Sequence, residues 1–265
     1  MFDRKERIMA DYLSDLLQVP NQLRRGRNVS EGYQRGAFLE SGHLRERINA
    51  DPDFQDAIVY TENRSIVTRD RLMNLFLLMK FFVPRLPSGD VIEFGSYRGG
   101  SAFFLACLAA KFLPGTQVFG LDTFEGMPAT DSSIDLHHAG QFADSSFDEV
   151  LAAKETFGLS NIHFVKGLFE ETAPALLQKA GSIVLAHIDC DIYEAVRYSY
   201  LVCKPYMIPM AYYVFDDATA AACVGATEAV EEFVIQQDRL HCEQIFPHFV
   251  FRHLQSSTVN PGKSR

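Results

Sequence analysis

Short apolar runs alternate along the chain with stretches in which apolar residues recur every three or four positions. The runs lie at residues 91–94, 118–121, 162–165, 183–188 and 212–215. The helical spacing occupies residues 101–112, 148–157, 171–179, 193–202 and 226–236. Short apolar runs are typical of buried strands, and a period near 3.6 is typical of amphipathic helices. Strands and helices in alternation predict an α/β fold with a doubly wound, Rossmann-like and mostly parallel sheet.

The pattern also predicts one element before this core and two after it. Residues 68–84 carry apolar side chains at helical spacing and end at Pro84, which predicts a packed helix leading to the first strand. Residues 241–246 and 248–253 read as two strands joined at Pro247. We therefore expect an antiparallel hairpin at the C-terminal edge of the sheet.

Two further segments lie outside the predicted sheet. Residues 1–60 are charged, with a short helical pattern at 8–17 and breaks at Pro and Gly positions. We expect them to form a lid or an oligomer contact beside a domain of residues 61–265. Residues 123–145 make a long polar loop, and loops of this size are often functional. Both segments are expected to close over the site and to shape the choice of substrate.

A glycine turn follows the first predicted strand, in the sequence EFGSYRGGS at residues 93–101. Strand, glycine turn, helix and strand form the unit that binds an adenosine-containing cofactor, and the glycines would let the backbone approach it. Asp122, at the tip of the second strand, is placed to accept hydrogen bonds from ribose hydroxyls. The turn is not GxGxxG, and Glu93, Tyr97 and Arg98 suit a pyrophosphate poorly. The turn therefore favours S-adenosylmethionine over NAD.

Carboxylates follow two later strands, at the points where these strands end. Asp189 and Asp191 come after the run at 183–188, and Asp216 and Asp217 end the run at 212–215. Ligands of open α/β sheets bind at the carboxyl ends of the strands. Neighbouring carboxylates repel one another, and a divalent cation removes that cost. Because all of these ligand atoms are oxygens, the pattern predicts Mg²⁺, Mn²⁺ or Ca²⁺.

Simpler interpretations remain open for several of these residues. Asp191 and Asp217 precede predicted helices and are typical N-cap residues. His187 lies two residues before Asp189 on the same strand face, and it is either a packed, hydrogen-bonded histidine or a residue of the site. The glycine turn also fits a plain connection from strand to helix.

Composition narrows the class of partner. The chain has 265 residues, 47% of them hydrophobic, and a formal net charge of −9. Negative charge argues against nucleic acid or an anionic membrane surface as the main partner, and no apolar run is long enough to span a bilayer. The five cysteines form no CxxC pair and lie mostly in apolar stretches. We expect buried thiols and a reducing, cytoplasmic setting.

Six sequence motifs together carry a resemblance to a known family. They are EFGSYRGGSA at 93–102, DTFEGMP at 122–128, FEETAP at 169–174, HIDCDIYEAV at 187–196, FDD at 215–217 and GATEAVEEF at 225–233. In their order and spacing they resemble the macrocin O-methyltransferase (TylF-like) family. Its members are metal-dependent enzymes that use S-adenosylmethionine to methylate deoxysugar hydroxyls on macrolides and related natural products.

The resemblance implies a class I methyltransferase fold and a role for each candidate residue. Asp189, Asp216 and Asp217 would hold Mg²⁺ or another divalent cation. Asp191 would be the general base, with His187 as a second candidate for proton transfer. The acceptor would be a glycosylated natural product or a similar small molecule, and the protein a homo-oligomer, dimer or tetramer. The residues implied in cofactor binding are Glu93, Gly95, Ser96, Tyr97, Arg98, Gly99, Gly100, Ser101, Asp122, Thr123, Gly167 and Asp189.

The chain departs from the family pattern before and after the fifth predicted strand. Met207-Ile208-Pro209-Met210 stands where the family usually has a Pro-Gly-Gly turn, and Ala218 stands where an aromatic residue is usual. Residues 1–60 match only faintly. Three rival functions are a metal-dependent methyltransferase of a phenol or catechol, an NAD-dependent dehydrogenase and a non-catalytic cofactor-binding protein. The glycine turn disfavours the second, and the four aspartates disfavour the third.

Overall fold

The computed structural model describes residues 23–24, 27–28 and 44–254, and the chain divides into two compact units, Met1–Asp51 and Pro52–Arg265. In the first unit, β1 (Leu23–Arg24) pairs antiparallel with β2 (Arg27–Asn28), and α3 spans Leu44–Asn49. The predicted helix at 8–17 lies outside the described residues. The second unit begins with α4 (Pro52–Ile58), which the sequence-based division had assigned to the N-terminal segment.

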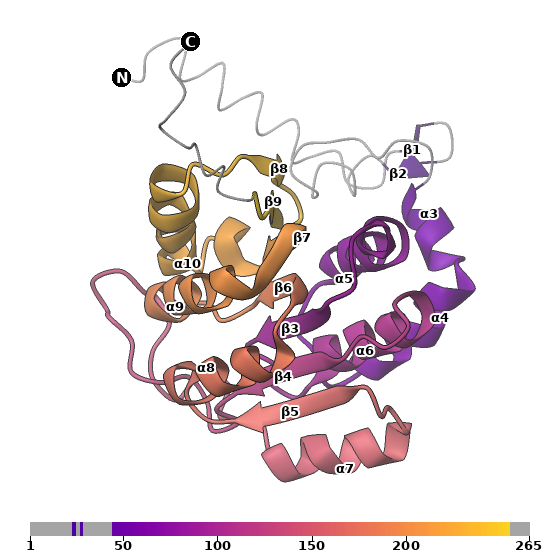
Figure 1. Ribbon diagram of the computed structural model, residues 1–265, viewed down its shortest axis with the longest axis horizontal. Helices are drawn as coiled ribbons and strands as arrows, with labels where there is room; N and C mark the ends of the chain where they lie inside the picture. Colours follow the sequence, from indigo (N-terminus) through magenta and orange to yellow (C-terminus); the bar gives the residue numbers. More distant parts are fainter. Residues whose placement is uncertain (1–22, 25–26, 29–43, 255–265) are drawn as a thin grey trace, which may run out of the picture. The chain divides into compact units, whose positions relative to one another are not determined.

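A seven-stranded sheet forms the centre of the second unit, in the order β5-β4-β3-β6-β7-β9-β8 (Figure 1). Strands β3 to β7 pair in parallel, whereas β9 runs antiparallel to both β7 and β8. This arrangement confirms the predicted doubly wound sheet with an antiparallel C-terminal edge. The strands are β3 (Asp90–Phe94), β4 (Val118–Asp122), β5 (Ile162–Lys166), β6 (Ile183–Ile188), β7 (Met207–Phe215), β8 (Cys242–Gln244) and β9 (Phe249–Arg252).

Helices cover both faces of the sheet, with α4 to α7 on one face and α8 to α10 on the other (Figure 1). Two of them continue as π-helical segments, α5 over Leu78–Phe82 and α10 over Val230–Gln237. Helix α6 lies deepest, and all its residues from Gly100 to Ala109 are buried. The remaining helices are α5 (Arg69–Leu77), α6 (Gly100–Phe112), α7 (Phe147–Phe157), α8 (Phe169–Ala180), α9 (Tyr193–Cys203) and α10 (Val224–Ala229).

The strand order reverses between β3 and β6, which is where open α/β sheets bind their ligands. The ends of these strands are fixed by backbone hydrogen bonds: Asp189 N–H donates to the Phe94 carbonyl and Gly95 N–H to that of Leu121, both at 2.9 Å. In the portion of the chain that is described, no helix is both long and apolar enough to cross a membrane. All five cysteines are free thiols, and four of them are buried.

Strand β7 differs from the sequence-based prediction at its beginning. It starts at Met207 rather than at residue 212, and its pairing with β6 changes register between Ile183 and Leu185. Pro209 reads as a strand breaker in the sequence, but prolines are accommodated at irregular positions of a sheet. Met210 takes a left-handed backbone conformation with φ of 66° at this irregularity.

Candidate active site

A cavity of about 530 Å³ opens at the carboxyl ends of β3, β4, β6 and β7. Its volume is in the range of small-molecule sites. The β3 turn and Asp122 form part of the wall, and the aspartates after β6 and β7 form another part. The segment 64–67, the loop after β4 and the start of α8 complete it. The predicted site residues that line the cavity are Gly95, Ser96, Tyr97, Ser101, Asp122, Thr123, Asp189, Asp191, Asp216 and Asp217.

Asp122 fixes the shape of the glycine turn. Its Oδ2 accepts the backbone N–H groups of Ser96 and Tyr97 at 2.9 and 2.8 Å, and its Oδ1 accepts that of Phe124 at 2.7 Å. Burial raises the pKa of Asp122, and these three hydrogen bonds oppose that rise. Tyr97 and Phe124 both hold left-handed backbone conformations, with φ of 50° and 53°. The carboxylate therefore holds two strained loop residues in place, and its contact with a ribose remains a prediction.

The glycines of the turn serve close packing within the protein. A Cβ on Gly95 would lie 1.7 Å from the Asp189 carbonyl oxygen, and one on Gly100 would lie 2.7 Å from the Ser65 Cβ. Gly99 has a φ of +81°, and a Cβ there would meet Phe103 and Phe164 at 3.0 Å. The space beside these glycines is filled by other segments of the chain. Packing within the protein thus explains these glycines, and their approach to a cofactor remains a prediction.

Glu93 and His187 lie behind the cavity wall and are fully buried. The Glu93 carboxylate accepts the Ser96 hydroxyl at 2.8 Å and contacts His187 Nδ1 at 2.9 Å, while His187 Nε2 lies 3.4 Å from Asp216 Oδ1. Burial lowers the pKa of His187, but its hydrogen bonds to Asp216 and Glu93 outweigh burial and raise the pKa to about 9. His187 is thus an imidazolium held between two carboxylates.

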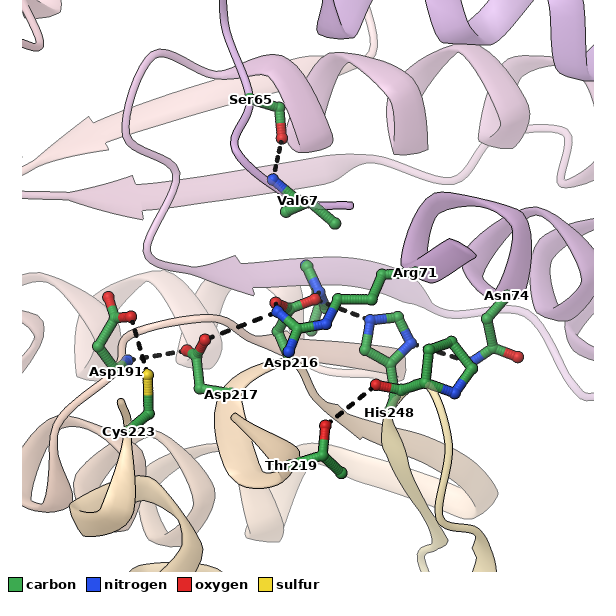
Figure 2. Close-up of polar contacts among 12 residues, drawn as sticks. Ser65, Val67, Arg71, Asn74, Asp191, Asp216, Asp217, Thr219, Cys223 and His248 are labelled. Atoms are coloured by element: carbon green, nitrogen blue, oxygen red, sulfur yellow. Dashed lines mark hydrogen bonds and ion pairs between the residues drawn. The ribbon is translucent and has the colours of Figure 1, made fainter. Parts of the chain in front are cut away.

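A second buried histidine completes the surroundings of Asp216 (Figure 2). His248 Nε2 donates to Asp216 Oδ1 at 2.7 Å, and His248 Nδ1 accepts from the Asn74 amide at 2.9 Å. Gln244 donates to Asn74 Oδ1 at 2.9 Å, which fixes the orientation of that amide. Burial lowers the pKa of His248 more than Asp216 raises it, so this histidine is neutral.

Three carboxylates meet at the cavity, and their oxygens lie within 4.8 Å of one another: Asp189, Asp216 and Asp217. Burial and the neighbouring carboxylates raise the pKa values of Asp189 and Asp217 well above normal. Burial also acts to raise the pKa of Asp216, but the hydrogen bonds from His187 and His248 lower it. An all-oxygen set of mutually repelling carboxylates fits a hard divalent cation such as Mg²⁺.

Arg71 of α5 already brings one positive charge to this cluster (Figure 2). Its guanidinium pairs closely with Asp216 Oδ2 and lies 3.9 Å from Asp217 Oδ1. Both aspartates are almost fully buried, so the guanidinium replaces part of the hydration that they lose. A divalent cation at this cluster would therefore compete with Arg71 for the same oxygens.

Asp191 stands apart from the cluster although it follows Asp189 closely in sequence. Its backbone has a φ of 59°, and its N–H donates to Asp217 Oδ2 at 2.9 Å. Its side chain is 20% exposed, and Oδ1 lies 3.5 Å from the Cys223 sulfur and 3.8 Å from His137 Nε2. Burial raises the pKa of Asp191, and His137 and Cys223 oppose the rise.

The remaining predicted site residues, Arg98, Thr123 and Gly167, contact other parts of the chain around the cavity. The Arg98 guanidinium pairs with Asp144 at 2.6 Å, and the Thr123 hydroxyl donates to the Gly126 carbonyl at 2.6 Å. Gly167 has a φ of 144° and packs against Thr172. Of these, only Thr123 lines the cavity. The predicted site residues that do not line the cavity are Glu93, Arg98, Gly99, Gly100, Gly167 and His187.

Sequence reasoning missed Arg71, Asn74, His137, Cys223 and His248. Arg71 and Asn74 lie three positions apart in an apolar helix, so they share a face, and this pairing was a usable signal. His137 comes from the long loop and lies 86 positions before Cys223, so no local pattern links them. No sequence pattern indicated His248, which belongs to the C-terminal hairpin.

The model of the Macrocin-O-methyltransferase (TylF) family matches residues 51–242, which is more than half of the chain. The chain belongs to this family. Two solved structures share the fold of this TylF-family chain. A calicheamicin methyltransferase matches with a TM-score of 0.61 and 20% identity, over 82% of this chain and 95% of that protein. The O-methyltransferase NovP matches with a TM-score of 0.63 and 18% identity, over 93% of this chain and 99% of that protein. The fold is that of class I methyltransferases, as the resemblance implied.

Two curated relatives of this TylF-family chain are named as O-methyltransferases. The 8-demethyl-8-(2,3-dimethoxy-alpha-L-rhamnosyl)-tetracenomycin-C 4'-O-methyltransferase of Streptomyces olivaceus is 29% identical over 172 residues, which cover 61% of this chain and 65% of the relative. The mycinamicin III 3''-O-methyltransferase of Micromonospora griseorubida is 25% identical over 210 residues, 75% of this chain and 79% of the relative. The first match thus spans slightly less than two thirds of that relative's length.

Proposed function

We propose that this chain is a Mg²⁺-dependent O-methyltransferase. It transfers the methyl group of S-adenosylmethionine to a hydroxyl of a deoxysugar carried by a natural product. Family membership supports the reaction, and the names of the two curated relatives support a sugar acceptor.

One observation carries the proposal: three carboxylates converge on the cavity that the β3 turn also lines. Asp189, Asp216 and Asp217 offer oxygens within 4.8 Å of one another. Gly95, Ser96 and Tyr97 form the wall beside them. A cation-binding cluster and a cofactor-binding turn in one cavity are what a metal-dependent methyl transfer requires.

The residues of the cavity wall and those buried behind it have distinct tasks in this reaction. When bound, Mg²⁺ lowers the pKa of an acceptor hydroxyl, and S-adenosylmethionine provides the methyl group. Asp191 accepts the hydroxyl proton at its carboxylate, because it lines the cavity but stands outside the three-carboxylate cluster. Asp122 keeps the turn in one shape, and the buried His187 and His248 keep Asp216 ionised and fixed.

The acceptor side of the cavity is built largely from the loop after β4. Gly126, Met127, Pro128, Ala129 and Phe142 of this loop line it. These apolar and small residues suit a sugar ring and its aglycone better than a highly charged acceptor. The loop therefore sets acceptor choice and excludes water during transfer.

The test is a methyl-transfer assay on a panel of acceptors. The full-length protein is incubated with S-adenosylmethionine and either glycosylated macrolides and polyketides or catechols, with Mg²⁺ or with a chelator. Mass spectrometry measures S-adenosylhomocysteine and the methylated product. We expect methylation of a glycosylated acceptor that requires the metal. Methylation of catechols alone would favour the phenolic alternative.

Binding measurements separate the other rivals from this proposal. Calorimetric titration should show binding of S-adenosylmethionine and none of NAD. Binding of the cofactor without turnover on any acceptor, with and without Mg²⁺, would favour the non-catalytic alternative. Equal turnover in the chelator would remove the metal from the proposal and leave the methyl transfer.

A further inference from the structure

Three metal-ligating side chains of different kinds meet beside the carboxylate cluster: His137, Asp191 and Cys223. Cys223 Sγ lies 3.4 Å from His137 Nε2 and 3.5 Å from Asp191 Oδ1, and the last two atoms are 3.8 Å apart. Zinc bonds of about 2.0–2.3 Å at a tetrahedral angle put ligand atoms roughly 3.3–3.6 Å apart. The observed triangle is within about half an ångström of that spacing.

The imidazole of His137 is oriented as a metal ligand. Its Nδ1 lies 2.8 Å from Gln141 Oε1, which also accepts the backbone N–H of His138 at 2.9 Å. This second bond identifies the Gln141 atom as the oxygen, so Nδ1 must be the donor. In the neutral ring, Nε2 then presents a lone pair toward Cys223 and Asp191. Histidines that bind metals are held in this way, with the other ring nitrogen donating to an acceptor.

Independent contacts hold the three segments that supply these side chains. The loop carrying His137 is fixed by the buried Asp135, whose Oδ1 accepts the Tyr193 N–H of α9 at 2.9 Å. Asp191 is fixed through its own N–H to Asp217, and Cys223 directly precedes α10 (Figure 2). The triangle therefore does not depend on bonds among its own three members, which is the condition for a preorganised site.

The donor set selects a different ion from the neighbouring cluster. Nitrogen, oxygen and sulfur together suit Zn²⁺ and related borderline ions, whereas Mg²⁺ prefers oxygen alone. Burial and the nearby Asp217 raise the pKa of the Cys223 thiol, so without a metal it keeps its proton. Binding of the ion therefore releases this proton to solvent.

We propose that His137, Asp191 and Cys223 form a second metal site, which binds Zn²⁺ or a similar borderline divalent ion. Three protein ligands leave one coordination position for water or another small ligand, as in open zinc sites. An ion at this site takes Asp191 as a ligand and so prevents it from accepting a proton. The resulting inhibition rests on the proposed function, whereas the binding does not.

Cobalt spectroscopy tests the binding directly. Co²⁺ is added to the full-length protein in saturating Mg²⁺, which keeps the three-carboxylate cluster filled. We expect a thiolate-to-cobalt charge-transfer band and strong visible bands of four-coordinate cobalt, both removed by Zn²⁺. The Cys223→Ser variant should lose the charge-transfer band, and His137→Gln should weaken Zn²⁺ binding by more than about tenfold.

Two matched variants serve as controls. Cys242→Ser changes a partly exposed cysteine of the C-terminal hairpin, and His138→Gln changes the exposed histidine next to His137. Both should keep the parent spectrum, and circular dichroism should show that all four variants are folded. Absence of a charge-transfer band in the parent protein would overturn the proposal, and so would its persistence in Cys223→Ser. In either case the three side chains form only a hydrogen-bonded cluster.

Turnover is measured separately, as the ratio of rates with and without Zn²⁺ in each protein. With the cobalt band present, we expect Zn²⁺ to inhibit the parent and Cys242→Ser proteins, and to inhibit Cys223→Ser much less. A cobalt band without inhibition would leave the metal site in place and remove Asp191 as the base. Absence of turnover in every protein would count against the proposed function, and the cobalt spectrum would still decide the site.

Discussion

Arg71 takes the position of a cation among acidic side chains, and this makes it a competitor of any metal. Its guanidinium contacts Asp216 and approaches Asp217, and its own side chain is only 17% exposed. Removing one partner of a buried ion pair leaves an uncompensated charge, which is costly. The same removal frees carboxylate oxygens for a metal ion. Replacing Arg71 should therefore lower the stability of the protein and raise its affinity for a metal ion.

The Arg71→Met variant tests this competition. Without metal, we expect its free energy of unfolding to fall by about 2–3 kcal/mol, because Asp216 loses its guanidinium partner. Added Mg²⁺ should raise the melting temperature more in the variant than in the parent. Thermal melts over a Mg²⁺ series measure both effects. Arg69→Met, on the same helix but over the Phe54 ring, is the control, and an equal Mg²⁺ response in the two variants would contradict the competition.

Asp191→Asn separates the proposed base from the proposed metal ligands. The amide keeps the size of the side chain but cannot accept a proton, so turnover should fall by roughly 10²–10⁴-fold. Mg²⁺ affinity should stay near that of the parent, because Asp191 lies outside the three-carboxylate cluster. Calorimetry gives the affinity and the methyl-transfer assay gives the rate. In Asp189→Asn, by contrast, Mg²⁺ affinity itself should fall, and its loss in Asp191→Asn would make Asp191 a ligand.

Among the single residues of the site, the sequence predicted the aspartates better than the side chains that contact them. The strand-tip aspartates follow apolar runs, and parallel strands place their carboxyl ends at one edge, so their convergence was predictable. Arg71 and His248 reach Asp216 across 145 and 32 positions, and such long-range contacts leave no local pattern. Glu93 was predicted to bind the cofactor, and its contact with His187 was not predicted. These two buried residues lie 94 positions apart, so their contact also leaves no local pattern.

Among the elements, the buried strands and regular helices were predicted most closely. Strands β3, β4, β5 and β6 each agree within one residue of the apolar run that predicted them. The beginning of β7 was wrong because Pro209 lies in an irregular segment that tertiary pairing accommodates. The π-helical ends of α5 and α10 also escaped prediction, since the periodicity of side chains hardly distinguishes them from α-helix.

Asp135 attaches the middle of the loop between β4 and α7 to the rest of the domain. Its carboxylate accepts the first N–H group of α9, and it is buried against Gly225, where a Cβ would lie 1.9 Å away. A carboxylate at a helix N-terminus also interacts favourably with the helix dipole. Residues 126–129 and 142 of this loop line the cavity, so the attachment holds the part of the wall where we propose that the acceptor binds.

Asp135→Ala should loosen this loop without disturbing the cofactor side. We expect a loss of about 1–2 kcal/mol in the free energy of unfolding, as for removal of an N-cap side chain. The KM for the acceptor should rise, while affinity for S-adenosylmethionine stays unchanged in calorimetry. In Asp131→Ala, in the same loop, the lost side chain bonds to the nearby Ser133, and both values should stay unchanged. A loss of cofactor affinity with an unchanged KM would contradict this division of the cavity.

For the molecule as a whole, the buried imidazolium of His187 links folding stability to pH. Its pKa of about 9 in the folded protein exceeds the ordinary value of 6.5. The folded state therefore holds the proton more tightly, and the stabilisation is complete below pH 6.5. It is lost as the pH rises through about 9. Burial raises the pKa values of Asp189 and Asp217, so their titration also lowers the free energy of unfolding as the pH rises.

Chemical denaturation of metal-free protein between about pH 6.5 and 8 measures this linkage. We expect the free energy of unfolding to fall by about 1–2 kcal/mol over this range through His187 alone. His187→Gln should have a shallower slope, because it cannot bind the proton. His241→Gln, a change at an exposed position, should keep the slope of the parent. A parent slope retained in His187→Gln would assign the linkage to other groups.

The C-terminal hairpin supplies one donor to Asp216, and the direction of protein synthesis gives this contact a further meaning. Arg71, Glu93 and His187 are all made before Asp216, but His248 is added only with the last hairpin and then bonds to Asp216 Oδ1 at 2.7 Å. While the ribosome still holds this segment, the acidic end of β7 lacks its final donor. A chain that stops before this hairpin therefore lacks one of the donors to Asp216.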